Sequence, residues 1–370
     1  MCGIIGYTGP REAVPVLLQG LKAMEYRGYD SSGIGYVERR KIRVFKKEGR
    51  IAALEKILPE SARTTSGIGH TRWATHGIVN DTNAHPHVSA SGRVAVVHNG
   101  IIDNYTALRD ELAAGGIPFA SDTDSEVIAQ LIDSCYDGDP EAAIVSALGR
   151  LEGTWGLTIL FVDQPEIVFG ARRGSPLMIG VGEREAFIAS DVRAFLGYTR
   201  QVIYLEDGDI ARIDPGGWKT WNMHRRDADR TPEEYPWESR DADRGRYPHF
   251  FIKEIMEQPE AVARAYGNGG RLVPEFGTAK IGGLNMEKRD FFDVQKIVYL
   301  GMGSAYYAGL AGARQMESVA RMPASVEDAS ELRYGNPIVD KGTLYFAISQ
   351  SGETADTIAA VREIQEKGGR

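Results

Sequence analysis

One of the two cysteines of this 370-residue chain directly follows the first methionine, in the opening Met1-Cys2-Gly3-Ile4. Cysteine is small enough to permit removal of that methionine, which would leave Cys2 with both a thiol and a free α-amino group. Such an amine, with an unperturbed pKa of about 7.7–8.0, can serve as the base for its own side chain. The position fits a nucleophile that needs no histidine partner, and it also fits a small residue that begins an edge strand with the apolar residues that follow.

Three stretches in the first half are polar where a simple β-sandwich would be apolar: HTRWATHG (70–77), HNGIIDN (98–104) and SDTDSEV (121–127). Near a thiol, the Asn99 amide and the Gly100 backbone N–H could form an oxyanion hole, although Asn-Gly after a strand is also typical of a turn. Arg72 could bind a carboxylate or form a surface ion pair, and Asp124 could receive an ammonium group or cap a helix. Such an arginine and aspartate would recognise an amino acid by its zwitterion, and the thiol would attack its side-chain carbonyl.

Histidines are concentrated in the same part of the chain, at His70, His76, His85, His87 and His98. Their spacing matches no compact zinc pattern. We therefore expect no metal ion, and no organic cofactor is implied. Trp73, taken alone, is typical of a core or a cavity wall.

Composition argues against several classes of protein. A net charge of −8 and an isoelectric point near 5.5 argue against a nucleic-acid partner and against an anionic membrane surface. The sequence has neither an apolar run of transmembrane length nor the basic-then-apolar start of a signal peptide. Two cysteines cannot form a disulfide framework, so we expect a protein of the reducing cytoplasm.

The elements that must position these residues follow two different patterns. Up to about residue 215, short strand-like segments predict antiparallel sheets, with helices near 10–25, 103–114, 124–136 and 139–149. This part should form two packed sheets inside outer helices. Residues 224–248 are charged and punctuated by proline, which is typical of a linker. After an amphipathic helix, a strand–turn–helix pattern occurs twice and predicts a parallel, doubly wound sheet.

A second candidate site lies in that later part, at SQSGET (349–354). The stretch follows an apolar strand and precedes a helix. Hydroxyl side chains, small residues and the N–H groups of a helix N-terminus together can hold an anion. Helix capping alone would also explain the composition.

Six motifs, in order, closely resemble those of class II glutamine amidotransferase domains: MCGIIGY, YRGYDSSGI, HTRWATHG, HPH, VVHNGIIDN and SDTDSEV. The resemblance implies an αββα fold of the N-terminal-nucleophile type, in which the Cys2 thiol attacks glutamine. It also implies that Asn99 and Gly100 form the oxyanion hole, that Arg72 binds the substrate carboxylate and that Asp124 binds its ammonium group. In the same family, Thr75 and His76 line a mobile glutamine loop, Trp73 lies at its tip as a gate to an ammonia channel, and Arg27 lies beside the nucleophile.

The later part resembles the sugar-isomerase domain found in the hexosamine-forming branch of that family, through SQSGET and ASELRYGNPIVDKG (329–342). The resemblance implies phosphate ligands at Ser349, Gln350, Ser351 and Thr354. One departure lies in the first glycine turn, where the family usually has Gly-Thr-Ser and this chain has Gly303-Ser304-Ala305. Either Ser304 replaces the missing hydroxyl or the sugar contacts differ.

Together these resemblances predict an α+β amidotransferase domain at 2–216, a linker at 217–250, and an incomplete α/β sugar-isomerase domain at 286–370. The implied reaction transfers the amide nitrogen of glutamine to fructose 6-phosphate and forms glucosamine 6-phosphate. Because the family's chains continue further, we expect these 370 residues to release ammonia from glutamine only. In the longer proteins, the sugar-isomerase domains are expected to form a homodimer.

Two related enzymes and one non-enzymatic module are alternatives to this activity. Asparagine synthetase would need an SGGxDS loop, and a phosphoribosyl amidotransferase would need a ribose-phosphate motif; the sequence contains neither. A regulatory module that only binds a sugar phosphate is the non-enzymatic alternative. The Gly303-Ser304-Ala305 departure and the missing C-terminal part of the family's chain favour it, and glutamate release from glutamine would discriminate between the two.

Overall fold

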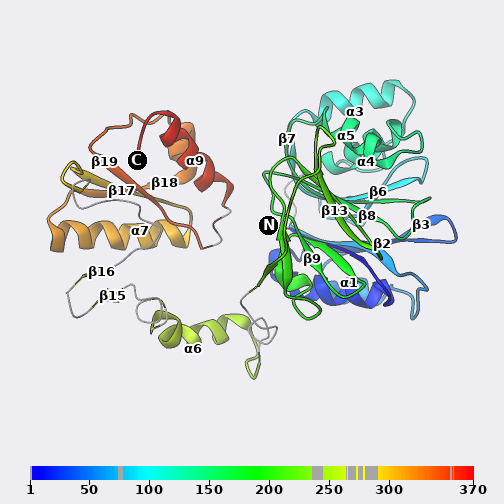
Figure 1. The fold of residues 1–370 in the computed structure, drawn as a ribbon, viewed down its shortest axis with the longest axis horizontal. Helices are drawn as coiled ribbons and strands as arrows, with labels where there is room; N and C mark the ends of the chain where they lie inside the picture. The colour runs from blue at the N-terminus through cyan, green and yellow to red at the C-terminus, as the bar shows by residue number, and fades with distance from the viewer. Residues whose placement is uncertain are drawn as a thin grey trace. The chain divides into compact units, whose positions relative to one another are not determined.

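The computed structural model describes residues 2–73, 78–235, 245–263, 265, 272–273, 278–279, 291–350, 352 and 354–370. The chain divides into two compact units, Met1–Gly245 and Arg246–Arg370 (Figure 1). Each unit has its own sheets and its own buried core. Among the described residues, no helix is both long and apolar enough to cross a membrane.

The first unit contains an eight-stranded antiparallel sheet, in which Cys2 immediately precedes a central strand. The strand order is β14-β11-β9-β10-β1-β4-β2-β3. The strands are β1 (Gly3–Thr8), β2 (Ser31–Glu38), β3 (Lys41–Glu48), β4 (Ser66–Arg72), β9 (Met178–Val181), β10 (Ala186–Ala189), β11 (Gln201–Tyr204) and β14 (Glu233–Glu234). The helices α1 (Ala13–Ala23) and α2 (Ile51–Glu55) contribute their apolar residues to the core on one face of this sheet.

A six-stranded antiparallel sheet packs on the other face, in the order β13-β12-β8-β7-β6-β5. Its strands are β5 (His87–Val88), β6 (Val94–Ile102), β7 (Gly153–Phe161), β8 (Val168–Arg173), β12 (Asp209–Asp214) and β13 (Gly217–Asn222). Three helices cover its outer face: α3 (Tyr105–Ala114), α4 (Asp124–Ser134) and α5 (Pro140–Leu148). They are the cyan-green helices above the sheets in Figure 1.

Strand β1 shows how the layers are held together. Ile5 and Tyr7 belong to the core that includes α1, whereas Ile4 belongs to the core between the sheets, with Ala95 and Val97 of β6. Because successive side chains of a strand point to opposite faces, a strand that is apolar at every position must be covered on both faces. The unit is therefore layered helix–sheet–sheet–helix, which confirms the predicted αββα class.

The structure differs from the predicted linker at residues 217–250. Residues 217–222 form β13, which pairs with β12 along its whole length, and Trp221 on this strand is only 1% exposed. Residues 233–234 form β14, which pairs with β11. These strands are difficult to recognise in the sequence because charged residues follow β13 and β14 itself consists of Glu233 and Glu234, so neither shows the apolar alternation of a central strand.

The second unit has a three-stranded parallel sheet in the order β18-β17-β19. In chain order its elements are β17 (Lys296–Gly301), α7 (Ser304–Gln315) with a π-helical end (Met316–Ala320), β18 (Ala324–Asp328), α8 (Ala329–Tyr334), β19 (Thr343–Ala347) and α9 (Ala355–Glu366). The unit also contains α6 (Phe250–Ala263) and a short antiparallel pair, β15 (Leu272–Val273) and β16 (Thr278–Ala279). Val298 and Leu300 pack with α8 and α9, whereas Tyr299, between them, lies against Gly309 of α7. Helices therefore cover both faces, as predicted for a doubly wound sheet.

Candidate active site

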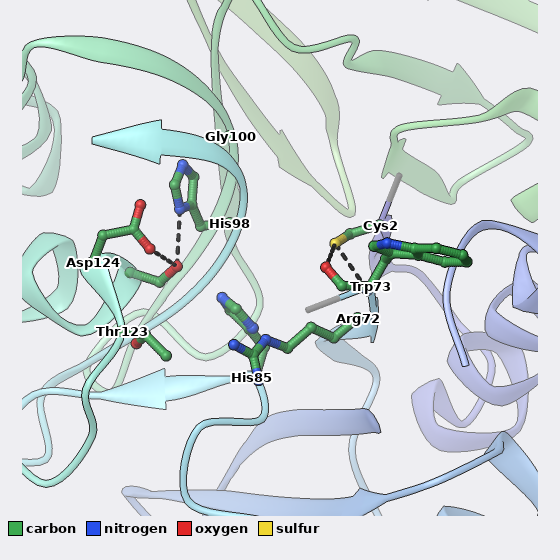
Figure 2. Close-up of a pocket in the computed structure, with 9 residues that line it drawn as sticks. Cys2, Arg72, Trp73, His85, His98, Gly100, Thr123 and Asp124 are labelled. Carbon is green, nitrogen blue, oxygen red and sulfur yellow. Dashed lines mark hydrogen bonds between the residues drawn. The ribbon is translucent and has the colours of Figure 1, made fainter. Parts of the chain in front are cut away.

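Cys2 lies at the edge of the first sheet, where β1 begins and the neighbouring strand β4 ends. The pairing of Gly3 with Thr71 brings Trp73, just beyond β4, next to the cysteine. The Trp73 N–H donates a hydrogen bond to Cys2 Sγ at 3.1 Å, and Sγ lies 3.4 Å from the Trp73 carbonyl oxygen (Figure 2). Burial raises the pKa of the Cys2 thiol, although the Trp73 hydrogen bond and the nearby positive charges act in the opposite direction. The thiol therefore needs a base to become a good nucleophile.

The Asn99-Gly100 pair lies within strand β6, not in a turn, because both residues are in register with β7. Gly100 has a φ of +139°, and a Cβ atom there would lie 2.1 Å from the carbonyl oxygen of Thr154. Only glycine fits both constraints. The side-chain Nδ2 of Asn99 donates a hydrogen bond to the carbonyl oxygen of Cys2 at 3.0 Å. The pair is thus fixed within reach of the cysteine by strand pairing between distant segments.

Arg72 and Asp124 provide opposite charges at the same cavity. Arg72 ends β4 and is 4% exposed, and its side chain extends from the Cys2 side of the cavity toward the other wall (Figure 2). Burial lowers the pKa of Arg72, while the nearby Cys2 and Asp124 raise it; a guanidinium remains charged under these conditions. Asp124 begins α4, where the helix dipole favours a carboxylate. Its Oδ2 accepts a hydrogen bond from the Ile102 N–H at 3.0 Å.

The helix cap at this position is a different residue from the one considered in the sequence. Thr123 is the N-cap of α4, and its hydroxyl oxygen accepts a hydrogen bond from the Glu126 N–H at 3.3 Å. The Asp124 carboxylate is therefore not needed to cap the helix. It lines the cavity instead.

One small cavity of about 30 Å³ brings these residues together. Its lining consists of Cys2, Arg72, Trp73, His85, His98, Gly100, Thr123, Asp124 and Ser125. The volume corresponds to about one water molecule. The predicted nucleophile, the glycine of the predicted oxyanion hole and the two opposite charges therefore meet at one cavity.

Arg27 lies beside the nucleophile, on a short 3₁₀ helix (Glu25–Arg27). Its Nε donates a hydrogen bond to the Cys2 carbonyl oxygen at 3.2 Å, and its Nη1 lies 2.9 Å from Asp191 Oδ2. The two side chains of this ion pair are 10% and 13% exposed. The Cys2 carbonyl is thus held from two sides, by Arg27 and by Asn99.

The surroundings of Trp73 agree with a cavity wall rather than a core. The side chain is 44% exposed and meets the Tyr29 ring edge to face, with 5.5 Å between centroids. Thr75 and His76, predicted to contact glutamine, lie outside the described residues.

In the second unit, the SQSGET stretch follows β19 and leads into α9. Ser349 and Thr354 lie close together, with 3.1 Å between their hydroxyl oxygens, and the Gly352 N–H donates to Ser349 Oγ at 3.0 Å. A cavity of about 410 Å³ adjoins them, lined by Ala347, Ser349, Gly352, Thr354, Thr357, Ile358, Val361, Arg362 and Gln365. Arg362 and Gln365 were not predicted, since they face this cavity only because of where α9 packs.

Gln350 and Ser304, two of the other predicted phosphate ligands, do not line this cavity. Gln350 is exposed, Ser351 lies outside the described residues, and Ser304 begins α7 after the neighbouring strand β17. β17 and β19 are adjacent and parallel, and the chain leaves β17 toward β18 on the opposite side. This is a topological switch point, where α/β sheets commonly bind ligands at the carboxyl ends of their strands.

Two family models match the sequence, a glutamine amidotransferase domain over residues 70–197 and a SIS domain over residues 290–370. The chain contains a glutamine amidotransferase domain and a SIS domain. The two regions lie in the first and second compact units, respectively.

Curated relatives match the whole chain. It is 45% identical over 371 residues to a glutamine–fructose-6-phosphate aminotransferase [isomerizing] from Caldanaerobacter subterraneus subsp. tengcongensis, covering 100% of this chain and 60% of the relative. It is also 45% identical over 373 residues to the protein of that name from Symbiobacterium thermophilum, covering 100% of this chain and 61% of the relative. The predicted resemblance is confirmed, and the chain spans about 60% of the length of these relatives.

Two solved structures share the fold. The allosteric regulatory enzyme of purine biosynthesis is 28% identical with a TM-score of 0.53, over 60% of this chain and 49% of that chain. The glutamine phosphoribosylpyrophosphate amidotransferase from B. subtilis is 21% identical with a TM-score of 0.54, over 88% of this chain and 65% of that chain.

Three residues of the glutamine amidotransferase domain for which the sequence predicts no role contact the predicted site residues. His70 contacts Asn99, Asp191 holds Arg27, and the Ser125 hydroxyl lies 2.9 Å from His98 Nδ1 and 3.4 Å from an oxygen of Asp124. Each follows or lies within a polar stretch at the end of an apolar strand or at a helix start. That position is the signal that could have identified them.

Three buried histidines of the amidotransferase domain, His70, His85 and His87, lie with their rings close together, tilted in one pair and edge to face in the other. The His70 and His85 ring centroids are 4.1 Å apart, and those of His85 and His87 are 4.6 Å apart. Within the described part of the chain, no three His, Cys, Asp or Glu side chains group as a metal site would require.

Proposed function

We propose that the first unit is a glutaminase, and that the longer protein represented by the relatives uses its ammonia to convert fructose 6-phosphate to glucosamine 6-phosphate. The observation that carries the proposal is the convergence of Cys2, Asn99-Gly100, Arg72 and Asp124. A nucleophile, oxyanion donors and a pair of opposite charges are what an amidotransferase acting on an amino acid requires. The names of the relatives support both the donor and the acceptor.

The chemistry begins with removal of Met1, which leaves the α-amino group of Cys2 as base. The thiol gives its proton to this amine and attacks the side-chain amide carbon of glutamine. The resulting oxyanion accepts hydrogen bonds from Asn99 Nδ2–H and the Gly100 N–H. Ammonia leaves with the transferred proton, and water then hydrolyses the thioester to release glutamate and restore the thiol.

The two charged residues of the site bind different groups of the substrate. Arg72 binds the α-carboxylate of glutamine in a bidentate manner, and Asp124 binds its α-ammonium group. Thr75, His76 and Trp73 complete the proposed glutamine site. Arg27 acts indirectly, because it holds the Cys2 carbonyl and thereby the position of the thiol.

The second unit is proposed to bind the phosphate of the sugar. Ser349 and Thr354 hold the phosphate at the N-terminus of α9, where backbone N–H groups and the helix dipole favour an anion. Gln350 and Ser351 belong to the same loop, and Ser304 lies on the neighbouring turn. We place the glutaminase within residues 2–216 plus the strands that follow, and the sugar-isomerase domain within residues 286–370.

Association through the second unit is part of the proposal. Its described surface carries apolar side chains that are almost fully exposed, including Phe292 (87%) and Ile338 (96%). Exposed apolar surface favours an interface between protein chains. Light scattering of the full-length protein should therefore give the mass of a dimer, and a monomer would contradict this part.

The test supplies the 370-residue chain with glutamine and fructose 6-phosphate and quantifies glutamate and glucosamine 6-phosphate separately. We expect glutamate without amino sugar, because the part of the relatives that this chain does not span is missing from the reaction. The Cys2→Ser variant is the matched control and should release no glutamate. Absence of glutamate from the unmodified chain, with retained binding of fructose 6-phosphate, would instead support the sugar-phosphate-binding alternative.

A further inference from the structure

His70 is a fully buried histidine that the proposed mechanism does not use. It lies on β4 between β1 and β2, and its ring is 0% exposed. Its Nε2 is 3.0 Å from Asn99 Oδ1 and 3.1 Å from the carbonyl oxygen of His98. The ring therefore touches the proposed oxyanion donor from the side opposite to the nucleophile.

The contact with His98 determines which ring nitrogen of His70 carries the proton. A backbone carbonyl can only accept a hydrogen bond, so Nε2 must be the protonated nitrogen. The same N–H then faces Asn99, which must turn its amide oxygen toward it. His70 Nδ1, the other nitrogen, has no hydrogen-bond partner among the described residues, which agrees with this assignment.

The other end of the Asn99 amide is fixed in the same way. The Cys2 carbonyl oxygen can only accept, so the Asn99 atom 3.0 Å from it must be the Nδ2 amino group. His70 on one side and Cys2 on the other thus select the same one of the two amide orientations. Without His70, only the Cys2 carbonyl would oppose a rotated amide, whose oxygen would face the nucleophile and repel an oxyanion.

The environment keeps the His70 ring neutral. Burial lowers its pKa to about 3, and the nearby Arg72 charge acts in the same direction, against the hydrogen bonds to Asn99 and His98. The neighbouring ring of His85, with its centroid 4.1 Å away, is also buried, and burial holds its pKa well below the usual value. The charges of Arg72 and His98 near His70 therefore both disfavour a second proton on its ring.

We propose that His70 is a positioning residue that sets the amide orientation of Asn99 and so directs its N–H toward the oxyanion. The proposal rests on the glutaminase function proposed above. It does not make His70 a catalytic residue, because its ring contacts Asn99 and not the reacting atoms. If His70 only filled the core, the effect of substituting it would not depend on whether the Asn99 side chain is present.

The test compares His70→Phe, His70→Gln and His70→Asn. Phenylalanine keeps the ring and loses the donor. The glutamine Nε2 is the same number of bonds from Cα as the histidine Nε2, whereas the asparagine Nδ2 is one bond closer. We therefore expect glutamine to retain most of kcat, and phenylalanine and asparagine to lower it at least about tenfold, toward the 10²–10³-fold loss typical of removing an oxyanion donor. KM for glutamine should stay within about twofold.

Two further measurements separate positioning from general damage. Alkylation of Cys2 by iodoacetamide, followed by mass spectrometry to exclude Cys135, develops no oxyanion and should keep its rate in all three variants. In the Asn99→Ala background, His70→Phe should lower kcat by less than about a further twofold, because the effects of substituting residues that act through one another are not additive.

Several outcomes would overturn the inference. They are a fall in the Cys2 alkylation rate parallel to kcat, full additivity with Asn99→Ala, or equal kcat for the glutamine and asparagine variants. If His70→Phe does not fold, the glutamine–asparagine comparison still decides. If the unmodified chain releases no glutamate, the proposed function itself fails, which is a different result from an active chain that tolerates His70→Phe.

Discussion

Asp191 accepts an ion-paired hydrogen bond from Arg27 at 2.9 Å, while the same guanidinium holds the carbonyl oxygen of Cys2. The two residues are 164 positions apart in the sequence. Tyr26 also donates to this carboxylate, and burial, followed by the Asp191 charge, raises the pKa of Tyr26 to about 12. Asp191 thus binds both Arg27, which contacts the nucleophile's carbonyl oxygen, and the adjacent residue Tyr26.

Replacing Asp191 with alanine should destabilise the first unit and reduce glutamate release. Breaking one partner of a largely buried pair leaves a charge without compensation and costs about 3 kcal/mol or more. All five tryptophans lie in the first unit, so urea unfolding followed by tryptophan fluorescence measures the effect. Glu111→Gln breaks the exposed Arg150–Glu111 pair and, as a control, should cost less than about 1 kcal/mol. Equal losses of unfolding free energy in the Asp191→Ala and Glu111→Gln variants would contradict this prediction.

The charges and the amide of the site should affect different kinetic constants. Arg72→Ala and Asp124→Ala should chiefly raise KM, because each removes a contact made in both the ground state and the transition state. Asn99→Ala should lower kcat by about 10²–10³-fold. Steady-state glutaminase kinetics measure both, and an Asn99→Ala variant that changed only KM would show that this residue is not an oxyanion donor.

A free α-amino group on Cys2 should be required for activity. A variant that retains Met1 or carries an N-terminal extension should fold normally and release no glutamate, since the thiol lacks its base. Burial raises the pKa of this thiol, so it is poorly ionised without help. N-terminal sequencing and glutamate release, measured on one preparation, provide the check. Full activity with the extension in place would exclude the mechanism.

Gly100→Ala should disrupt the site by steric overlap. The added Cβ would lie 2.1 Å from the Thr154 carbonyl oxygen, at a φ of +139° that an L side chain rarely adopts. We expect activity to fall below detection and the unfolding midpoint to decrease. Gly92→Ala is the matched control, because Gly92 has a φ of +74° with no atom near the new Cβ. If both variants behaved alike, backbone strain and not steric overlap would be the cause.

The buried histidines should make the first unit sensitive to acid. Burial lowers the pKa of His70 to about 3 and that of His87 well below its usual value. Their unfolded forms take up protons below about pH 6.5, whereas the folded forms do not. The free energy of unfolding is therefore highest above that pH and falls as the pH decreases toward 3, by up to about 1.4 kcal/mol per pH unit for each histidine.

Urea unfolding of the first unit between pH 7 and pH 4 tests this dependence. His87→Gln should reduce the slope of the free energy of unfolding against pH by the contribution of one proton. Substitution of the exposed His224 by glutamine should leave this slope unchanged. A slope unaffected by His87→Gln would mean that this histidine does not supply it.

The sequence allowed the residues at strand and helix ends to be predicted better than the contacts between them. Cys2, Arg72, Asn99 and Asp124 were identifiable because polar residues interrupt apolar segments there. The structure brings these four residues together, and their chemical roles stay predictions. The ring of His70 against Asn99 depends on how the two sheets stack. No local pattern encodes that arrangement.

Edge strands are also difficult to predict from the sequence. The strand β13 carries Trp221 into the core, yet charged residues follow it in the sequence and only a short bridge at Asp227 pairs with its outer side. Periodicity is weak in such a segment, so the sequence favoured a linker. Pairing with β12, which is fixed elsewhere in the sheet, decides its conformation.

The position of β1 between β4 and β10 also sets an order of events during synthesis. Cys2 is among the first residues made, but β1 pairs with Ser66–Arg72 and Ala186–Ala189, and Asp191 lies just beyond the second of these strands. At about 5–20 residues per second, the ribosome needs on the order of tens of seconds to deliver the last of these partners. The nascent chain therefore carries its thiol through most of the domain's translation before the surrounding site can form.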